Sequence, residues 1–202
     1  MEAPVDPSAP VPAGKLLSTI TYLEMDAPPA RPMRPAPLEK LALLRAEECT
    51  VAFYRFLYNT VGEPWLWGFR RRLPDEELRA LIQAPSVSIH VAYVRGVPAG
   101  YFELDRSEPR TCDISYFGLM PEFIGRRIGP WLLDQAIASA WSEPGMRKLT
   151  VNTCTFDHPR AVMTYQKAGF RPVEQEVQYM DDPRVVGVIP RHVAPQHPIV
   201  GA

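Results

Sequence analysis

The stretch best suited to chemistry is a glycine-bearing turn at residues 121–133, with the sequence Pro-Glu-Phe-Ile-Gly-Arg-Arg-Ile-Gly-Pro-Trp-Leu-Leu. It follows an apolar stretch that predicts a strand, and it opens a segment with helical periodicity. Backbone N–H groups in the first turn of a helix have no partner inside the helix, and the helix dipole adds partial positive charge there. Gly125 and Gly129 let the backbone come close to a ligand. Arg126 and Arg127 add full charges, so a phosphate-bearing cofactor would fit this turn.

The glycine spacing alone matches no established phosphate-binding motif. Gly125 and Gly129 lack the Lys-Ser/Thr ending of a Walker loop and the Gly-x-Gly opening of a dinucleotide fingerprint. On spacing alone, a tight strand-to-helix turn with a solvated arginine pair explains these residues as well as a cofactor site does. The elements around the turn must decide between the two.

Composition indicates one globular domain with a sizeable core, because the 202 residues are 46% hydrophobic and 22% charged. Lysine and arginine number 22 against 23 acidic residues, which argues against a protein built to bind nucleic acid or an anionic membrane. The three cysteines are too far apart for a disulfide framework or a zinc cluster. No apolar run is long enough to span a bilayer, and the amino end does not resemble a signal peptide. We therefore expect a soluble cytoplasmic protein without a metal.

Apolar patterns divide the chain into strands and helices around one sheet. Strands are expected over residues 16–25, 41–45, 87–94, 100–104, 111–120, 148–155 and 170–179. Helices are expected over residues 49–61, from residues 74–77 onward, over 130–141 and over 159–168. A turn is expected at residues 95–98. This order predicts an α/β layout around one mixed sheet.

Proline-rich segments bound the expected domain, which spans residues 15–180. Residues 1–14, rich in proline and alanine, are expected to be disordered. Residues 28–37 are expected to form an extended connector. The tail over residues 181–202 lacks periodicity, and we expect it to wrap the surface as an irregular segment.

Three stretches together resemble the GCN5-related N-acetyltransferase (GNAT) family. The family carries a Gln/Arg-x-x-Gly-x-Gly/Ala turn after its fourth strand, and residues 124–129, Ile-Gly-Arg-Arg-Ile-Gly, match that turn. Residues 158–170, His-Pro-Arg-Ala-Val-Met-Thr-Tyr-Gln-Lys-Ala-Gly-Phe, resemble its Asn-x-x-Ala-x-x-x-Tyr-x-x-x-Gly-Phe helix. The strand between them carries Asn152. The resemblance covers residues 87–180 and implies an α/β fold with a mixed, mostly antiparallel central sheet flanked by helices.

The sequence departs from the family pattern at three positions. Ile124 stands where the family has Gln or Arg, Arg127 where it has its first glycine, and His158 where it has Asn. A Cβ atom at Arg127 would push the loop away from a pyrophosphate, whereas its guanidinium could bind the phosphate in bidentate geometry. Both readings of Arg127 stay open on the sequence.

The resemblance implies acetyl-CoA as a co-substrate, and it implies two groups on the chain that act on the thioester. The backbone N–H of Leu119 would hold the thioester carbonyl, and Tyr165 would protonate the leaving thiolate. From spacing alone, Tyr165 would instead be a core aromatic residue. The cofactor-binding residues carried over are Phe117, Leu119, Met120, Gly125, Arg126, Arg127, Ile128, Gly129, Pro130, Asn152 and His158.

The resemblance implies that the general base is either a carboxylate near the predicted strands over residues 100–104 and 111–120 or a water chain held by several groups. Glu103 lies inside a predicted strand, where an acidic residue is unusual unless it has a partner or a function. Asp113, at the start of the next predicted strand, is the second candidate for the base. Each is more often the exposed face of a half-solvated sheet than a catalytic group. Glu103 is the base that we predict.

Acceptor specificity is expected in the connection between the first two helices, residues 61–72. Trp65 and Trp67 could line an apolar or cationic pocket, and Glu63 could meet an ammonium group. Equally, these residues could fill the core, and Arg70 to Arg72 could be a solvated run. The sequence does not separate these readings.

The predicted function is an acetyl-CoA-dependent N-acetyltransferase that acts on a primary amine of a small molecule or a peptide. The alternative is a catalytically inactive acyl-CoA-binding module that acts through protein partners. We expect no nucleic acid and no membrane as partners. Members of the family often form homodimers, although nothing in this sequence marks an interface.

Overall fold

The computed structural model describes residues 5, 7–37 and 40–201. Its strands are β1 (Lys15–Met25), β2 (Leu41–Arg45), β3 (Val87–Val94), β4 (Val97–Asp105), β5 (Thr111–Leu119), β6 (Lys148–Cys154) and β7 (Arg171–Asp181). Its α-helices are α1 (Val51–Gly62), α2 (Phe69–Arg72), α3 (Asp75–Ile82), α4 (Ile128–Trp141) and α5 (Ala161–Ala168). Two short 3-10 helices, η1 (Glu63–Trp65) and η2 (Pro121–Phe123), complete the described elements.

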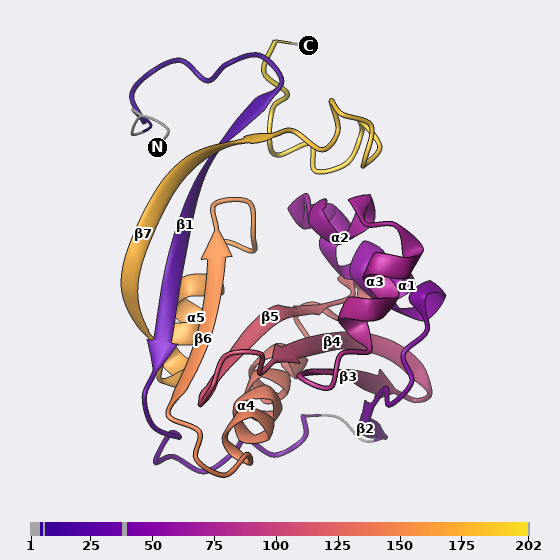
Figure 1. Cartoon of the computed structure of the whole chain (residues 1–202), viewed down its shortest axis with the longest axis vertical. Helices are drawn as coiled ribbons and strands as arrows, with labels where there is room; N and C mark the ends of the chain where they lie inside the picture. The colour runs from indigo at the N-terminus through magenta and orange to yellow at the C-terminus, as the bar shows by residue number, and fades with distance from the viewer. Residues whose placement is uncertain (1–4, 6, 38–39, 202) are drawn as a thin grey trace.

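All seven strands form one sheet in the order β2-β3-β4-β5-β6-β1-β7 (Figure 1). Only β5 and β6 pair in parallel; the other neighbours are antiparallel. The α/β fold with a mixed, mostly antiparallel sheet is therefore confirmed.

Strand β1 lies far from its neighbours in the chain. It pairs with β6 through Ile20–Met25 and with β7 through Lys15–Glu24, and so lies between them in the sheet. The chain then crosses to the opposite edge of the sheet, where β2 begins at Leu41. The sequence predicted β1 as a strand but not this position.

The connector from β1 to β2 is pinned to α4 by one buried carboxylate. Asp134 accepts hydrogen bonds from Arg31 Nη2 (2.6 Å), Arg34 Nη1 (2.6 Å) and the Arg34 backbone N (3.0 Å). Burial raises the pKa of Asp134, whereas the hydrogen bonds and charges of the two arginines lower it. The second effect is larger, so the pKa lies below the ordinary value for aspartate. Residues 38–39 of this connection lie outside the described residues.

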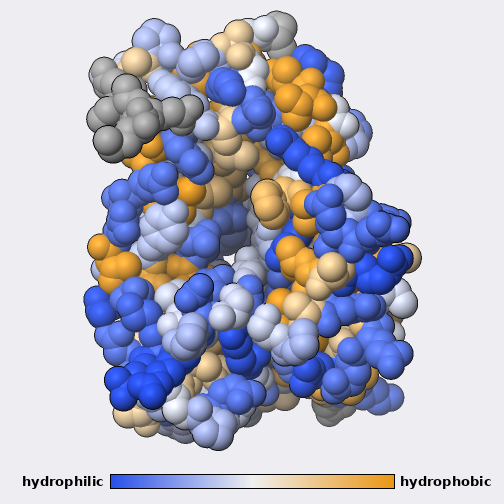
Figure 2. Space-filling view, viewed as in Figure 1, coloured by the Kyte–Doolittle hydropathy of each residue, from blue (hydrophilic) through white to orange (hydrophobic). Residues whose placement is uncertain are grey.

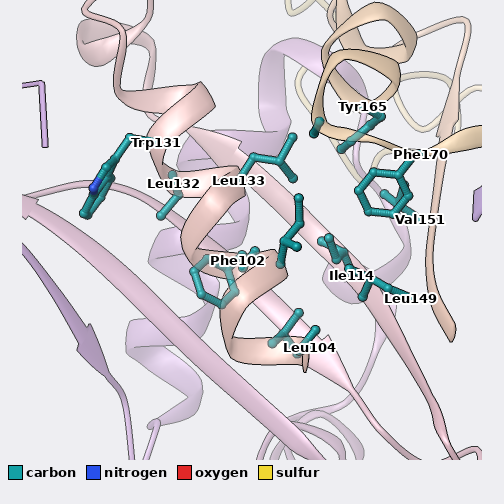
Figure 3. Packing of buried hydrophobic residues seen from close by; sticks show 14 of the residues in the cluster. Phe102, Leu104, Ile114, Trp131, Leu132, Leu133, Leu149, Val151, Tyr165 and Phe170 are labelled. Carbon is teal, nitrogen blue, oxygen red and sulfur yellow. The ribbon is translucent and has the colours of Figure 1, made fainter. Parts of the chain in front are cut away.

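The two faces of the sheet carry separate cores. On one face, Leu132 and Leu133 of α4 pack beside Phe102 and Leu104 of β4, as Figure 3 shows. On the other face, α1 and α3 pack on β3 and β4 through residues such as Leu57, Leu78 and Ile89. Thr50 caps α1, because its side chain accepts a hydrogen bond from the Phe53 N–H.

Strands β5 and β6 part within the sheet. Their pairing ends at Ile114 and Val151, although β5 continues to Leu119 and β6 to Cys154. A bulge starts the divergence, because Glu103 and Leu104 pair with Tyr116 and Ile114 and leave Ser115 as an extra residue. In Figure 1 the two strands point away from each other above this branch point.

The structure differs from the sequence prediction at short elements. Arg95 and Gly96 both have positive φ (51° and 86°) and form the whole turn, so Val97 and Pro98 belong to β4 rather than to the turn. Helix α2 and the 3-10 helix η1 occupy the predicted connection, residues 61–72. Both are too short to show periodicity.

The carboxyl-terminal tail is irregular but tightly held. Arg184 pairs with Asp182 (Nη2 to Oδ2, 2.7 Å) and donates from Nη1 to the carbonyl groups of Val193, Ala194 and His197. The predicted disorder over residues 1–14 falls partly on residues 1–4 and 6, which lie outside the described residues. Within the described part, the Gly14 N–H donates to the Val200 carbonyl (2.9 Å).

Across the described ranges, every helix is too short or too polar to cross a membrane.

Candidate active site

A cavity of about 810 Å³ opens where β5 and β6 part. It runs from the first turn of α4, past the ends of β5 and β6, to η1 and the residues that follow it. Ser18 and Ile20 of β1, together with Gln178 and Met180 of β7, line it across the gap. The space-filling view is hollowed at the same place (Figure 2).

One end of the cavity is the predicted anion cradle. Gly125, Arg127, Gly129 and Pro130 line it, and α4 begins at Ile128. Arg127 makes no side-chain capping hydrogen bond, so the first N–H groups of this helix are left for a ligand. Gly125 has φ 84°, and a Cβ atom added there would meet only open space.

Three residues predicted for cofactor binding do not line the cavity. The Arg126 guanidinium lies 5.0 Å from the ring centroid of Phe123. Ile128 is fully buried in the core beneath α4, and Met120 is buried against the α1 face. These two apolar side chains therefore belong to the two cores and not to the cavity lining.

Arg127 adopts a backbone conformation that favours glycine. Its φ of 62° and ψ of 12° lie in the left-handed region, where a non-glycine residue costs about 1 kcal/mol. The loop thus keeps a glycine-like backbone conformation at this position, and Arg127 is one of the residues that line the cavity.

The end of β5 directs backbone N–H groups into the gap. The Met120 N–H donates to the Ala99 carbonyl (2.9 Å), and hydrogen-bonding direction alternates along an antiparallel pair. The N–H groups of Phe117 and Leu119 therefore point away from β4 and toward the gap. Both residues line the cavity.

Tyr165 of α5 lies in the cavity wall on the same side as Phe117. Its ring centroid is 6.3 Å from that of Phe117 and 5.8 Å from that of Phe170, and 7% of the residue is exposed. Burial raises the pKa of Tyr165, and the charges of Asp157 and Asp113 raise it further. The phenol is therefore protonated at neutral pH.

Glu103, the predicted base, is fully buried behind the wall. It accepts hydrogen bonds from Tyr54 Oη (2.5 Å) and Arg70 Nη2 (2.7 Å), and it is not among the lining residues. Burial raises its pKa, and the Arg70 charge opposes that rise. Arg70 is thus half of a buried ion pair and not part of a solvated run.

Asp113 lies at the branch point of β5 and β6. Its carboxylate accepts hydrogen bonds from Thr150 Oγ1 (2.7 Å) and Ser115 Oγ (2.9 Å). Burial raises its pKa, and these two bonds oppose the rise only in part. Because Ser115 lines the cavity, its hydroxyl links Asp113 to the cavity.

The predicted acceptor residues divide into two groups. Trp65 and Trp67 line the cavity, whereas Glu63 pairs with Arg71 (3.0 Å) outside it. The Trp67 ring packs so closely on Gly62 that a Cβ atom there would clash. Trp67 is therefore both a packed residue and a wall of the site.

Asp157 lines the cavity but was not among the residues predicted from the sequence. It follows β6 and accepts a hydrogen bond from Trp67 Nε1 (3.2 Å). Its other oxygen accepts from Thr153 Oγ1 (2.9 Å) and the Cys154 N–H (2.9 Å). A polar turn directly after a buried strand was the available signal.

Asn152 and His158 also line the cavity, on the β6 side. His158 Nδ1 accepts a hydrogen bond from the Arg160 N–H (3.1 Å) just before α5, and its ring contacts Trp65. Within the described part of the chain, no cluster of His, Cys, Asp and Glu could hold a metal ion.

Comparison with known protein families gives the family of this chain. The model of the acetyltransferase (GNAT) family matches residues 54–170, which is more than half of the chain. The chain belongs to the GNAT acetyltransferase family. The matched range contains the cradle, the diverging strands and Tyr165.

Solved GNAT structures share the fold at low sequence identity. An N-acetyltransferase from Sphaerobacter thermophilus is 17% identical, with a TM-score of 0.57 over 82% of this chain and 52% of that one. One from Kribbella flavida is 11% identical, with a TM-score of 0.54 over 86% and 63%. A tandem GNAT protein from the clavulanic acid biosynthesis pathway is 16% identical, with a TM-score of 0.50 over 85% and 53%.

The chain thus spans between about half and two thirds of the length of these structures. A search among curated proteins gave no match.

Proposed function

We propose that this GNAT domain is an acetyl-CoA-dependent N-acetyltransferase that acts on a primary amine of a small molecule or a peptide. The observation that carries this proposal is that one cavity joins the α4 cradle, the parted ends of β5 and β6, and an aromatic wall. A phosphate-bearing co-substrate and an amine can then meet at the branch point.

The residues at the cradle suit the phosphate groups of acetyl-CoA. The first turn of α4 presents uncapped N–H groups, and Arg127 adds a full charge at the cavity wall. Gly129 has no side chain and Pro130 a compact one, so a ligand can approach the backbone of this turn closely. Asn152 and His158, on the opposite side, are proposed to contact the pantetheine arm.

Two groups of this chain act on the thioester in the proposed reaction. The Leu119 N–H, directed into the gap, stabilises the oxygen of the thioester carbonyl as charge develops on it. The amine nitrogen bonds to the carbonyl carbon, and the carbon–sulfur bond breaks. Tyr165 then gives its proton to the leaving thiolate, and the raised pKa of its phenol keeps that proton available.

For the base, the geometry supports Asp113 better than Glu103. Glu103 is held in a buried ion pair, whereas Asp113 has two neutral hydroxyl partners. The Ser115 oxygen accepts a proton from the amine as its own proton moves to Asp113. This relay links the cavity to Asp113, which is not itself among the lining residues.

The first experiment is a calorimetric titration of the protein with acetyl-CoA and with CoA, followed by assays of Tyr165→Phe. We expect binding of both ligands in the micromolar range. The variant should bind acetyl-CoA as well as the parent but lower kcat by at least roughly tenfold, because it lacks the acid.

The outcomes separate the two functions considered. Unchanged turnover in Tyr165→Phe would remove Tyr165 from the mechanism. Binding of acetyl-CoA without turnover of any amine would support an acyl-CoA-binding module that acts through partners. Absence of binding at millimolar ligand would overturn both functions.

A further inference from the structure

The cavity wall opposite the cradle is aromatic. Trp67 lies 5.4 Å from Tyr58 and 5.1 Å from Tyr116, and those two rings lie 5.0 Å apart, measured between ring centroids. All three rings line the cavity, and Ile20 and Met180 face them across the gap. Rings and apolar side chains favour a ligand with an apolar body.

Negative and positive side chains are unequal in number among the described residues that line the cavity. Among the described residues that line the cavity, Asp157 supplies the one carboxylate, whereas Arg127 and Arg160 supply guanidinium groups. Both arginines lie at helix starts on the side proposed for acetyl-CoA. A ligand with one ammonium group matches this wall, and a polycation meets repulsion.

Asp157 retains hydrogen-bonding capacity for such an ammonium group. Its Oδ2 accepts two hydrogen bonds, from Thr153 and Cys154, whereas its Oδ1 accepts the one from Trp67 Nε1. A carboxylate oxygen has two lone pairs, so Oδ1 has room for one more donor. The same bond fixes the indole ring beside the place where the body of the amine would lie.

The tail limits the length of a ligand at this end of the cavity. Leu66 and Phe156, which line the cavity, pack in one cluster with Ile189 and Val193 of the tail. Gln196 also donates to the Pro64 carbonyl (3.1 Å), which joins the tail to η1. An extended peptide would have to displace these contacts.

We infer that the acceptor is a compact primary monoamine with an apolar, ring-bearing body. Its single nitrogen pairs with Asp157 as an ammonium group when the ligand binds, and the same nitrogen then gives a proton to Ser115 and bonds to the thioester carbon. Its body lies against Trp67 and Tyr116. This inference rests on the proposed function, because it names the substrate class of the same site.

The test compares three acceptors at equal concentration with saturating acetyl-CoA: phenethylamine, spermidine and a short peptide with a free amino terminus. The value of kcat/KM for phenethylamine should exceed the other two by at least roughly tenfold, because only it matches both the rings and the single carboxylate. Equal or faster turnover of spermidine or the peptide would overturn the inference but leave the acetyltransferase proposal standing. The inference also fails if the protein binds acetyl-CoA and does not turn over phenethylamine.

Two variants test the assigned contacts separately. Asp157→Asn keeps the shape of the side chain but removes its charge, and should raise KM for phenethylamine about tenfold with little change in the Kd of acetyl-CoA. Trp67→Phe keeps a ring and removes the donor to Asp157, and should also raise that KM. The matched controls are Asp26→Asn, in an exposed ion pair with Arg171, and Trp141→Phe, at the end of α4 outside the cavity lining. An unchanged KM in both test variants would contradict the assignment.

Discussion

At the scale of the residue, Arg127 combines a strained backbone with a charged side chain at the cavity. Substituting Arg127→Gly should raise the free energy of unfolding by about 1 kcal/mol, because glycine adopts positive φ without strain. The same change should weaken acetyl-CoA binding by about five- to tenfold, more at low salt, because a phosphate partner is lost. Thermal unfolding and calorimetry measure the two effects independently.

The adjacent residue provides the control for Arg127. Arg126→Gly places glycine where φ is not positive and removes the contact with Phe123, so it should lower stability and leave acetyl-CoA binding unchanged. Equal effects of the two variants on acetyl-CoA affinity would show that neither arginine meets a phosphate.

Asp113 is the second residue whose environment makes a prediction. Burial raises its pKa, so its carboxylate forms at a higher pH than that of a free aspartate, and kcat should rise with pH through this value. Asp113→Asn should lower kcat by about a hundredfold and abolish that acidic limb, while thermal stability is retained.

Glu103→Gln gives the contrast for this experiment. It should lower the melting temperature, because it leaves the Arg70 charge buried without its partner. If Glu103→Gln instead removes the acidic limb and Asp113→Asn does not, Glu103 is the base and the relay through Ser115 is wrong.

At the scale of the element, the connector between β1 and β2 depends on Asp134. Its folded-state pKa lies below the ordinary value, so its contribution to stability is present above about pH 4 and is lost as the pH falls through the folded value. Asp134→Asn should therefore cost about 2 kcal/mol at pH 7, and the difference from the parent should shrink toward pH 3.

Thermal unfolding at several pH values measures this difference. Asp26→Asn, which removes an exposed carboxylate, serves as the control and should change stability little at any pH. A constant difference between parent and Asp134→Asn from pH 7 to pH 3 would contradict the assigned contribution.

The elements themselves show where sequence reasoning succeeds. Strand β2 and helix α4 follow local apolar patterns, and their bounds lie within two residues of the prediction. Helix α2 was missed because it has four residues, fewer than the pattern needs. The cradle and Tyr165 could be proposed from the sequence because residues 124–129 and 158–170 keep a family spacing. Asp157 could not, because its contacts with Trp67 and Thr153 follow from no local pattern.

At the scale of the whole molecule, β5 and β6 part at one end of the sheet, and the tail contacts residues on both sides of the gap between them. Arg184 and Asp182 fold the tail into a compact unit that contacts Leu66 and Phe156. The tail sequence shows no periodicity. Its fixed conformation comes from Arg184, which donates hydrogen bonds to three carbonyl groups of the tail. This is why an irregular surface segment was predicted and its contacts with the site were not.

The position of β1 also sets an order of events during synthesis. Its partners are made late: Tyr22 donates to Glu176, which is 154 residues further along the chain, and Lys148 reaches back 124 residues to Glu24. Strand β1 therefore stays without these partners until β6 and β7 have been synthesised. Contacts of such long range slow folding, and a waiting strand exposes its edges to other nascent chains. Because β1 stays unpaired for so long, we expect chaperones to assist the folding of this domain during synthesis.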